Sequence, residues 1–483
     1  MMNPITRFFW MAGFWIMGTF VSGQTHSAMG ASPLGFPSGD NPSSASVPEP
    51  RPDGKDRHVI PLPPVFWPGE SAFPSHNPVF STQVLLSEWS RRFSRNGVGE
   101  DFASGIVTAS GRVFAASTSG HVEALEGSSG RSLWHVRVEG PVYAPMILSK
   151  RTLYVVTSSP SITLAHLLVY TRTRHLLRGD GLERIWALSQ RSGRILWSRK
   201  LPGAVLGSPL LEPHTIALAT GLGHLLFVSR QDGHKVVDLP VSDGSFGWSS
   251  PLDGSDAIYV AQENPPMIDR VGKFPLKTDW SFAMSGTRSY DRFFIGGPVL
   301  TGTGVASVFR EKDSGAMSLV SLDGVTGKIL WTFPLSETSV DVPEEMLTLV
   351  FSDGVLYVPV PEKGELVAVS EKGALLWKTH VGGHPHTGGT AVGRLLLVPL
   401  SSGHIVALDR KNGEKVHEWA GKAPLGPRSL PVIGSMIFFA DRMGEVRAMD
   451  LSSFGEKADR LSKTPFLKEK GPLKDVVRGN PDE

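Results

Sequence analysis

Short apolar segments bounded by turn residues recur along the middle of the chain. Segments such as 366–370 (LVAVS) and 405–409 (IVALD) are apolar on both faces, and a turn that contains Gly follows each of them. Another short apolar segment precedes each hairpin, for example 354–360 (GVLYVPV). Because no helical period of comparable strength is present, the pattern predicts β-hairpins whose strands are covered on both sides.

One phrase repeats in these hairpins, and its clearest copy is GHIVALDRKNGEKVHEW at 403–419. Four short strands recur roughly every 40–60 residues, which is typical of the blades of a β-propeller. In four copies a Trp stands four residues after the turn Gly: Gly130/Trp134, Gly193/Trp197, Gly327/Trp331 and Gly373/Trp377. Val237 takes the Trp position after Gly233, and Trp419 comes six residues after Gly413.

The number of blades follows from the last strand of each unit. Seven units end near Trp134, Trp197, Val237, Trp280, Trp331, Trp377 and Trp419. An eighth unit, 425–455, has only three strands, while the segment VLLSEWSRRF with Trp89 belongs to no complete unit. We therefore predict an all-β fold over residues 83–455, an eight-bladed β-propeller of four-stranded antiparallel blades that is closed by an N-terminal strand. Such closure removes two exposed strand edges.

The two ends of the chain have a different composition. Arg7 precedes the apolar run 8–21, and the small residues Ser22 and Gly23 follow it. We therefore expect residues 1–23 to be a cleavable signal peptide and the protein to be exported to the periplasm. Residues 24–82 are rich in Pro, Ser and Gly and predict a flexible leader. Residues 456–483 mix basic and acidic side chains and predict a charged flexible tail. We expect no transmembrane span in the mature chain, because no second apolar stretch has the necessary length.

Composition narrows the possible functions. The 483 residues include 48 Lys and Arg against 46 Asp and Glu, which gives a net charge of +2. This balance argues against nucleic acid as a partner, because phosphate binding requires a basic excess. The chain contains no Cys, so disulfides, thiolate metal sites, iron–sulfur clusters and covalently attached haem are excluded within it.

The phrases WALSQRSGRILW and SLDGVTGKILW resemble the tryptophan-docking repeat of pyrroloquinoline-quinone (PQQ) propellers. In that family the Trp packs against the next blade, so the resemblance implies a structural docking role for Trp89, Trp134, Trp197, Trp331, Trp377 and Trp419. The family includes quinoprotein dehydrogenases, which bind PQQ and calcium in the central funnel. It also includes the non-enzymatic eight-bladed propeller of the outer-membrane β-barrel assembly machinery, whose lipid-anchor Cys has no counterpart here.

Several features weigh against a dehydrogenase. In many members of that branch the quinone lies under a vicinal disulfide, which a chain without Cys cannot form. A calcium and quinone site also needs converging carboxylates and an amide. The candidate ligands are limited to Glu263–Asn264 and to Asp341 or Glu344. We therefore expect no catalytic residues and no cofactor, with a PQQ- and calcium-dependent dehydrogenase as the alternative.

The remaining chemistry points to a binding surface. In a propeller, the loops from one blade's outer strand to the next blade's inner strand open on the same face as the loops between the two middle strands, and we name this the funnel face. The candidate binding residues on this face are Tyr143, Arg172, Arg174, Trp248, His384, His386 and Arg428. Two of the arginines belong to the largest insertion, 158–181. Aromatic, Arg and His side chains together match the composition of a protein-binding hot spot.

Two narrower alternatives concern the same face. His384 and His386 offer two imidazole ligands to a metal ion, against the interpretation of a polar loop between blades. Trp248 offers a stacking platform to a sugar or another small ligand, against the interpretation of packing between blades. The favoured prediction is a non-catalytic scaffold that binds a protein partner in the cell envelope and acts in envelope assembly.

Overall fold

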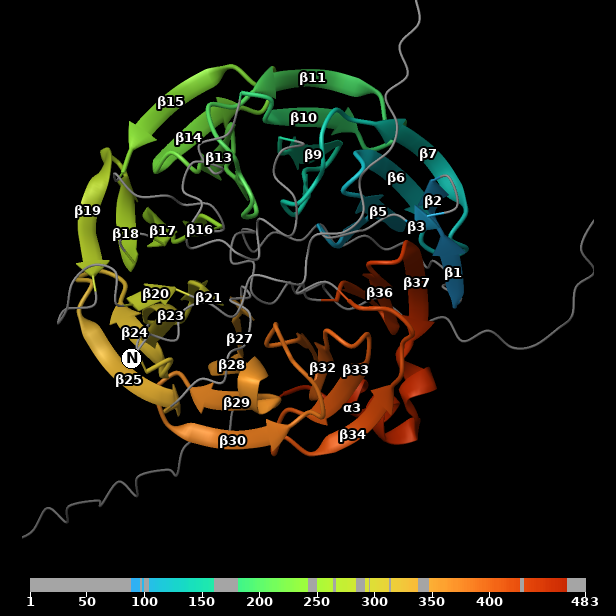
Figure 1. Cartoon of the computed structure of the whole chain (residues 1–483), viewed down its shortest axis with the longest axis vertical. Helices are drawn as coiled ribbons and strands as arrows, with labels where there is room; N and C mark the ends of the chain where they lie inside the picture. The colour runs from blue at the N-terminus through green and yellow to red at the C-terminus, as the bar shows by residue number, and fades with distance from the viewer. Residues whose placement is uncertain are drawn as a thin grey trace, which may run out of the picture. The chain divides into compact units, whose positions relative to one another are not determined.

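The computed structural model describes residues 88–95, 98–99, 104–159, 181–241, 250–263, 266–283, 292–294, 296–311, 314–337, 347–425 and 430–466. Within these residues, eight antiparallel sheets of four or five strands follow one another around a ring, as Figure 1 shows. Two further two-stranded sheets pair β2 (Ser94–Arg95) with β3 (Val98–Gly99) and β21 (Gly296–Gly297) with β26 (Leu347–Thr348). The predicted eight-bladed β-propeller is therefore confirmed. The expected signal peptide and leader lie outside the described residues.

Each blade runs from an inner to an outer strand. Blade 1 consists of β4 (Ile106–Ala109), β5 (Arg112–Ala116), β6 (His121–Glu126) and β7 (Ser132–Arg137). Blade 2 consists of β8 (Ile147–Leu148), β9 (Thr152–Thr157), β10 (Arg184–Ser189) and β11 (Ile195–Lys200). Blade 3 consists of β12 (Leu210–Leu211), β13 (Thr215–Ala219), β14 (His224–Ser229) and β15 (Lys235–Pro240). Blade 4 consists of β16 (Leu252–Asp253), β17 (Ala257–Glu263), β18 (Pro266–Lys273) and β19 (Leu276–Ala283).

The second half of the ring repeats this order. Blade 5 consists of β22 (Val299–Leu300), β23 (Gly304–Glu311), β24 (Met317–Asp323) and β25 (Ile329–Ser336), and β20 (Arg292–Phe294) also pairs with β23. Blade 6 consists of β27 (Val350–Ser352), β28 (Val355–Val360), β29 (Glu365–Ser370) and β30 (Leu375–His380). Blade 7 consists of β31 (Thr390–Val392), β32 (Leu395–Pro399), β33 (Ile405–Asp409) and β34 (Lys415–Trp419). Blade 8 consists of β35 (Val432–Ile433), β36 (Met436–Ala440), β37 (Glu445–Asp450) and β1 (Trp89–Arg92).

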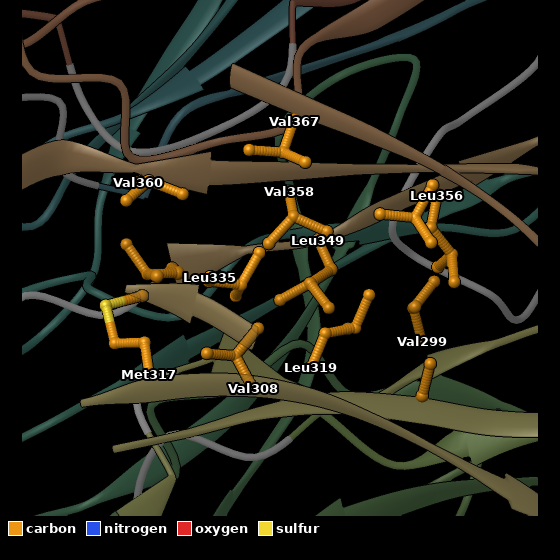
Figure 2. Packing of buried hydrophobic residues seen from close by; sticks show 13 residues of the cluster. Val299, Val308, Met317, Leu319, Leu335, Leu349, Leu356, Val358, Val360 and Val367 are labelled. Carbon is orange, nitrogen blue, oxygen red and sulfur yellow. The ribbon is translucent and has the colours of Figure 1, made fainter. Parts of the chain in front are cut away.

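The core lies between adjacent blades, which explains why the middle strands are apolar on both faces. β28 is buried at all six of its positions, whereas the outer strand β30 is buried only at Trp377. Figure 2 shows one such core, in which side chains of blade 5 meet side chains of blade 6: Val308, Met317 and Leu319 with Val358, Val360 and Val367. Each sheet therefore buries both faces against its neighbours.

The N-terminal strand completes the last blade, as predicted. β1 pairs antiparallel with β37, with Trp89 opposite Ala448 and Arg92 opposite Glu445. In Figure 1 the blue β1 lies beside the red β37, so segments from opposite ends of the described chain close the ring. This pairing covers a strand edge that each segment would otherwise expose.

A β-bulge precedes the Trp position in the outer strand. In blade 2, Leu188 pairs with Ile195 while Ala187 pairs with Trp197, so Leu196 is the extra residue. The same register shift occurs in the outer strands of the other blades from 1 to 7, and the extra residues there are Leu133, Val236, Asp279, Leu330, Leu376 and Val416. Because a bulge re-aims the side chain that follows it, the shift turns this position toward the next blade.

The C-terminal segment differs from the expected flexible tail over residues 456–466. The helices η3 (Leu451–Phe454) and α3 (Glu456–Lys463) follow blade 8, and Ala458 and Leu461 of α3 are buried. The backbone carbonyl of Leu461 accepts a hydrogen bond from the Arg394 backbone N–H at 3.0 Å. Ala458 and Leu461 form a short apolar stripe among the charged side chains of α3. This stripe packs on blade 7 and orders this part of the segment. No helix among the described residues is long and apolar enough to cross a membrane.

Candidate functional site

The recurrent spacing of the tryptophans is explained by contacts between blades. A Cβ built on Gly193 of blade 2 would stand 2.5 Å from the indole of Trp134 in blade 1, and Trp134 Nε1 donates to the carbonyl of Gln190 at 2.9 Å. The turn glycines of five other blades meet the Trp of the preceding blade in the same way: Trp89/Gly130, Trp197/Gly233, Trp280/Gly327, Trp331/Gly373 and Trp377/Gly413. These tryptophans therefore make contacts between blades, and the candidate binding residues must be sought elsewhere.

Two positions depart from this arrangement for a topological reason. Trp419 packs against Phe439, with ring centroids 5.3 Å apart, and Arg447 lies over its ring. In blade 7 the residue directly after the bulge is His417 rather than a Trp, and Trp419 lies two residues further along β34, opposite Ile405. Because the last two strands of blade 8 come from opposite ends of the described chain, no turn joins them that could receive a Trp from blade 7. Val237 faces blade 4, whose turn between β18 and β19 has only two residues. The turns that receive a Trp in other blades have four or five residues, so a Trp at this position would have no such turn to contact.

The structure describes three of the predicted funnel-face residues. Tyr143 is buried, His386 is buried, and His384 is exposed. The other candidate residues named from the sequence lie outside the described residues or side chains: Arg172, Arg174, Trp248, Glu263, Asn264, Asp341, Glu344 and Arg428. Tyr143 lies in the connection from blade 1 to blade 2, whereas His384 and His386 lie in the connection from blade 6 to blade 7, so the described candidates belong to two separate loops. His384 is the exposed residue among them.

The short helix η2 (Pro361–Lys363) joins β28 to β29 on the funnel face and is fixed to blade 5. The buried Glu362 carboxylate lies 3.6 Å from the Arg310 guanidinium and accepts a hydrogen bond from Ser336 Oγ at 3.1 Å. Lys363 Nζ donates to the backbone carbonyl of Leu335 at 3.3 Å. A buried ion pair with hydrogen bonds around it holds one geometry, because separating its partners would leave a charge buried alone.

Two histidines fix the other side of η2. His384 Nδ1 donates to the carbonyl of Pro361 at 2.9 Å, and His380 Nδ1 donates to the carbonyl of Lys363 at 3.1 Å. Since a carbonyl only accepts, Nδ1 carries the hydrogen in both rings and Nε2 is the acceptor in the neutral form. Residues 361–363 with His380 and His384 form a rigid unit, which we name the histidine platform.

His386 does not join His384 at a shared site. Its backbone carbonyl accepts a hydrogen bond from the Thr348 N–H at 2.8 Å, and Pro385 forms an antiparallel bridge with Leu400. The 384–386 segment thus links the inner ends of blades 6 and 7. Across the described ranges, His, Asp and Glu side chains form no group of three or more that could hold a metal ion.

Sequence analysis identified His384 but missed the residues that position it. Arg310 and Glu362 are far apart in the sequence, and each resembles an ordinary surface charge there. The Pro after a buried strand at 361 was the only local signal that a turn with fixed geometry lay between β28 and β29. The partnership of two charges across a blade interface requires the register of both sheets.

A second buried polar group lies in blade 4, beside the hairpin that contains Glu263. The Asp269 carboxylate is fully buried, with Gln262 and Ser281 as its hydrogen-bond donors. Burial raises the pKa of Asp269 above its ordinary value, although both hydrogen bonds act in the opposite direction. Among the described residues, no cation is paired with this carboxyl group.

The seam between blades 8 and 1 contains a carboxylate with the opposite shift. Glu123 is buried, and its two oxygens lie 3.1 Å from Arg91 Nη2 and 2.9 Å from His121 Nε2. Burial alone would raise the pKa of Glu123, but hydrogen bonds from His121 and Ser132 and the charge of Arg91 outweigh it and hold the pKa below its usual range. The ionised carboxylate therefore joins the closing strand to blade 1.

Comparison with known proteins gives matches over the propeller. A family model described as outer membrane protein assembly factor BamB matches residues 86–270 and 276–453. Tetrathionate hydrolase from Acidithiobacillus ferrooxidans is 21% identical over 409 residues, which cover 80% of this chain and 80% of that protein.

Solved structures share the fold at low sequence identity. BamB from Moraxella catarrhalis superposes with a TM-score of 0.53 at 17% identity, covering 76% of this chain and 97% of that one. The quinohemoprotein alcohol dehydrogenase ADHIIG from Pseudomonas putida HK5 gives a TM-score of 0.52 at 13% identity, covering 80% and 78%. These likenesses concern the architecture, which proteins of different function share.

Proposed function

Because the chain belongs to the family of the outer membrane protein assembly factor BamB, we propose that it is a non-catalytic protein-binding scaffold that acts in the periplasm during assembly of the cell envelope. The observation that carries this proposal is the family match, which extends over residues 86–270 and 276–453 and so includes strands of all eight blades. The predicted signal peptide agrees with export. The role requires a rigid surface and no cofactor.

We place the binding surface on the funnel face, at the histidine platform. Glu362 and Lys363 attach the platform to blade 5, while His384 attaches it to the connection toward blade 7. A surface held from two sides loses little freedom on binding, which favours association. His384 is exposed and presents Nε2 beyond its hydrogen bond, so it offers a partner both an aromatic ring and an acceptor.

Affinity capture from a periplasmic extract tests this proposal. The full-length protein should recover a defined set of envelope proteins, and His384→Ala should recover them at least fivefold less well. His234→Ala is the matched control, because His234 is also exposed but lies in the turn between β14 and β15 on the opposite face. Equal recovery by both variants would remove the platform from the proposal. A protein that captures no partner above a no-bait control would overturn the scaffold function itself.

A second candidate is catalysis on a small substrate, and one finding favours it. The similarity to tetrathionate hydrolase extends over 80% of both chains. Incubation with tetrathionate, followed by measurement of the sulfur products, tests a related hydrolysis directly. The PQQ- and calcium-dependent alternative is tested by an absorbance change and dye-linked alcohol oxidation after incubation with both. Its candidate ligands, like Trp248 for a sugar or small ligand, lie outside the described side chains.

A further inference from the structure

Positive charge is concentrated in blade 2. Residues 147–159 and 181–200 contain seven cationic side chains and one acidic side chain, Glu183, whereas the whole chain has a net charge of only +2. The cations are Lys150, Arg151, Arg184, Arg191, Arg194, Arg199 and Lys200. The net charge of the rest of the chain is therefore negative, which makes blade 2 the basic side of the ring.

Among the described residues, these cations have no acidic partners of the kind that other blades provide. In blades 4 and 7, Arg270, Arg394 and Arg410 each form an ion pair with an Asp. None of the seven cations of blade 2 forms an ion pair with any described residue. Their charge is not neutralised locally and is available to an external anion.

Four of the seven lie together on the face opposite the funnel face. Lys150 and Arg151 are in the turn between β8 and β9, while Arg191 and Arg194 are in the turn between β10 and β11, and all four are exposed. Gln190 joins the two turns, because its N–H donates to the carbonyl of Arg151 at 3.0 Å and its side chain donates to the carbonyls of Ser149 and Thr152. We name Lys150, Arg151, Arg191 and Arg194 the basic cluster.

Exposed aliphatic side chains adjoin the basic cluster. Ile195 and Leu196 follow Arg194 on the outer strand β11 and are 41% and 44% exposed. The bulge at Leu196 directs this side chain out of the blade while Trp197 turns inward. Arg199 and Lys200 continue the strand and are also exposed. Cations and aliphatic side chains therefore share one outer rim.

We propose that the rim of blade 2, formed by the basic cluster with Ile195 and Leu196, docks on an anionic lipid surface. Basic residues near anionic headgroups are attracted without fixed geometry, and aliphatic side chains beside them enter the boundary of the acyl region. The cations of the basic cluster are exposed and form no ion pair with a carboxylate of the described residues, so they can follow mobile headgroups. A binding site for a folded acidic protein would instead be expected to contain aromatic side chains and Arg side chains held in place by hydrogen bonds. The described residues of this rim do not include such a set.

Vesicle co-sedimentation tests the proposal with the full chain. Vesicles of about 30% phosphatidylglycerol in phosphatidylcholine should bind the protein, vesicles of phosphatidylcholine alone should not, and salt should weaken binding. Replacing all four residues of the basic cluster by Gln should reduce binding by about fivefold for each charge removed. The matched control replaces Lys277, Lys328, Lys372 and Lys422 by Gln, since these exposed lysines give the same charge change on blades 4 to 7. The control should bind as the wild type does.

A second pair of variants separates the apolar contact from charge. Leu196→Ser should weaken vesicle binding severalfold, whereas Leu330→Ser should not, although both are exposed bulge residues directly before a docking Trp. Equal losses in the two charge variants, or equal binding to neutral and anionic vesicles, would overturn the proposal. The proposal would also be overturned if the wild type bound no vesicles and the basic-cluster variant instead lost either the capture of an acidic protein or self-association.

Discussion

The indole of Trp134 in blade 1 lies against Gly193 of blade 2, so close that a Cβ on Gly193 would stand 2.5 Å from the ring. Gly193 also has a positive φ of 69°, which only Gly adopts readily. Two independent constraints, one steric and one conformational, therefore meet at one residue. Their repetition around the ring explains why the Gly and the Trp of the repeat recur together.

Gly193→Ala should destabilise the protein more than Gly181→Ala. Both glycines have positive φ, so both changes carry about 1–2 kcal/mol of backbone strain. The methyl group added at position 193 would also overlap Trp134, which adds about 1–3 kcal/mol, whereas nothing lies within 4 Å of a Cβ at Gly181. Urea unfolding monitored by circular dichroism measures the difference. Equal midpoints would show that Trp134 can move away from the added methyl group without loss of stability.

Trp377→Ala should cost more stability than Trp419→Ala. Trp377 is buried against Gly413 and donates Nε1 to the carbonyl of Arg410 at 2.8 Å, so its removal should cost about 3–5 kcal/mol. Trp419 is half-buried and has no receiving turn. Trp377→Phe should recover part of the loss because it refills the space without the hydrogen bond. Thermal melting of the three variants checks the order, which a larger loss for Trp419→Ala would contradict.

Removal of β1 should destabilise the ring far more than removal of the leader. A chain that begins at residue 88 keeps Trp89, whose Nε1 donates to the carbonyl of Gly127 at 2.9 Å. A chain that begins at residue 94 loses β1, exposes the edge of β37 and empties the space beside Gly130. Differential scanning calorimetry should give a much lower Tm for the shorter chain only. Equal Tm values would refute closure by the N-terminal strand.

Stability should depend on Glu123 at neutral pH and not in acid. The pKa of Glu123 is lowered in the folded protein, so its contribution is fully present above the pKa of the unfolded chain and is lost as the pH falls through the folded pKa. Glu123→Gln should therefore lower the urea midpoint at about pH 7 and differ little from the wild type near pH 3. An effect of the same size at both values would show that the ionised form contributes nothing.

The contribution of Asp269 to stability should depend on pH in the opposite direction. Burial raises its pKa, so its contribution is present below the pKa of the unfolded chain and is lost as the pH rises through the folded pKa. Asp269→Asn keeps the shape without the charge. The urea midpoint of this variant should rise relative to the wild type over the pH range that begins near the pKa of an unfolded Asp, about 4, and ends above the raised folded pKa. A constant difference across that range would mean that Asp269 does not titrate with folding.

The fold could be predicted from the sequence because each blade carries its own local signal. Apolar runs, turn glycines and tryptophans recur with the repeat, and the incomplete last copy together with Trp89 predicted the closure that β1 and β37 form. The prediction for the first part of the tail was wrong, since Ala458 and Leu461 are too few apolar residues to reveal the buried side of α3 among its charges.

The candidate site was less predictable, because it depends on contacts between blades. His384 was identified from its neighbours in the sequence, but its orientation comes from the carbonyl of Pro361 in another loop. The ion pair of Arg310 and Glu362 joins two blades, and only the structure shows that the blade 2 cations form no ion pair within the described part of the chain. Local patterns do not determine such long-range partners.

Site-specific photo-crosslinking in the cell envelope tests the central claim most directly. A photoreactive amino acid would replace His384 on the funnel face, and Asn412, which is exposed in the turn between β33 and β34 on the opposite face, would be the control position. The scaffold function predicts a discrete adduct with one or a few envelope proteins from position 384 and none from position 412. No adduct from position 384, or the same adducts from both positions, would contradict a protein-binding funnel face.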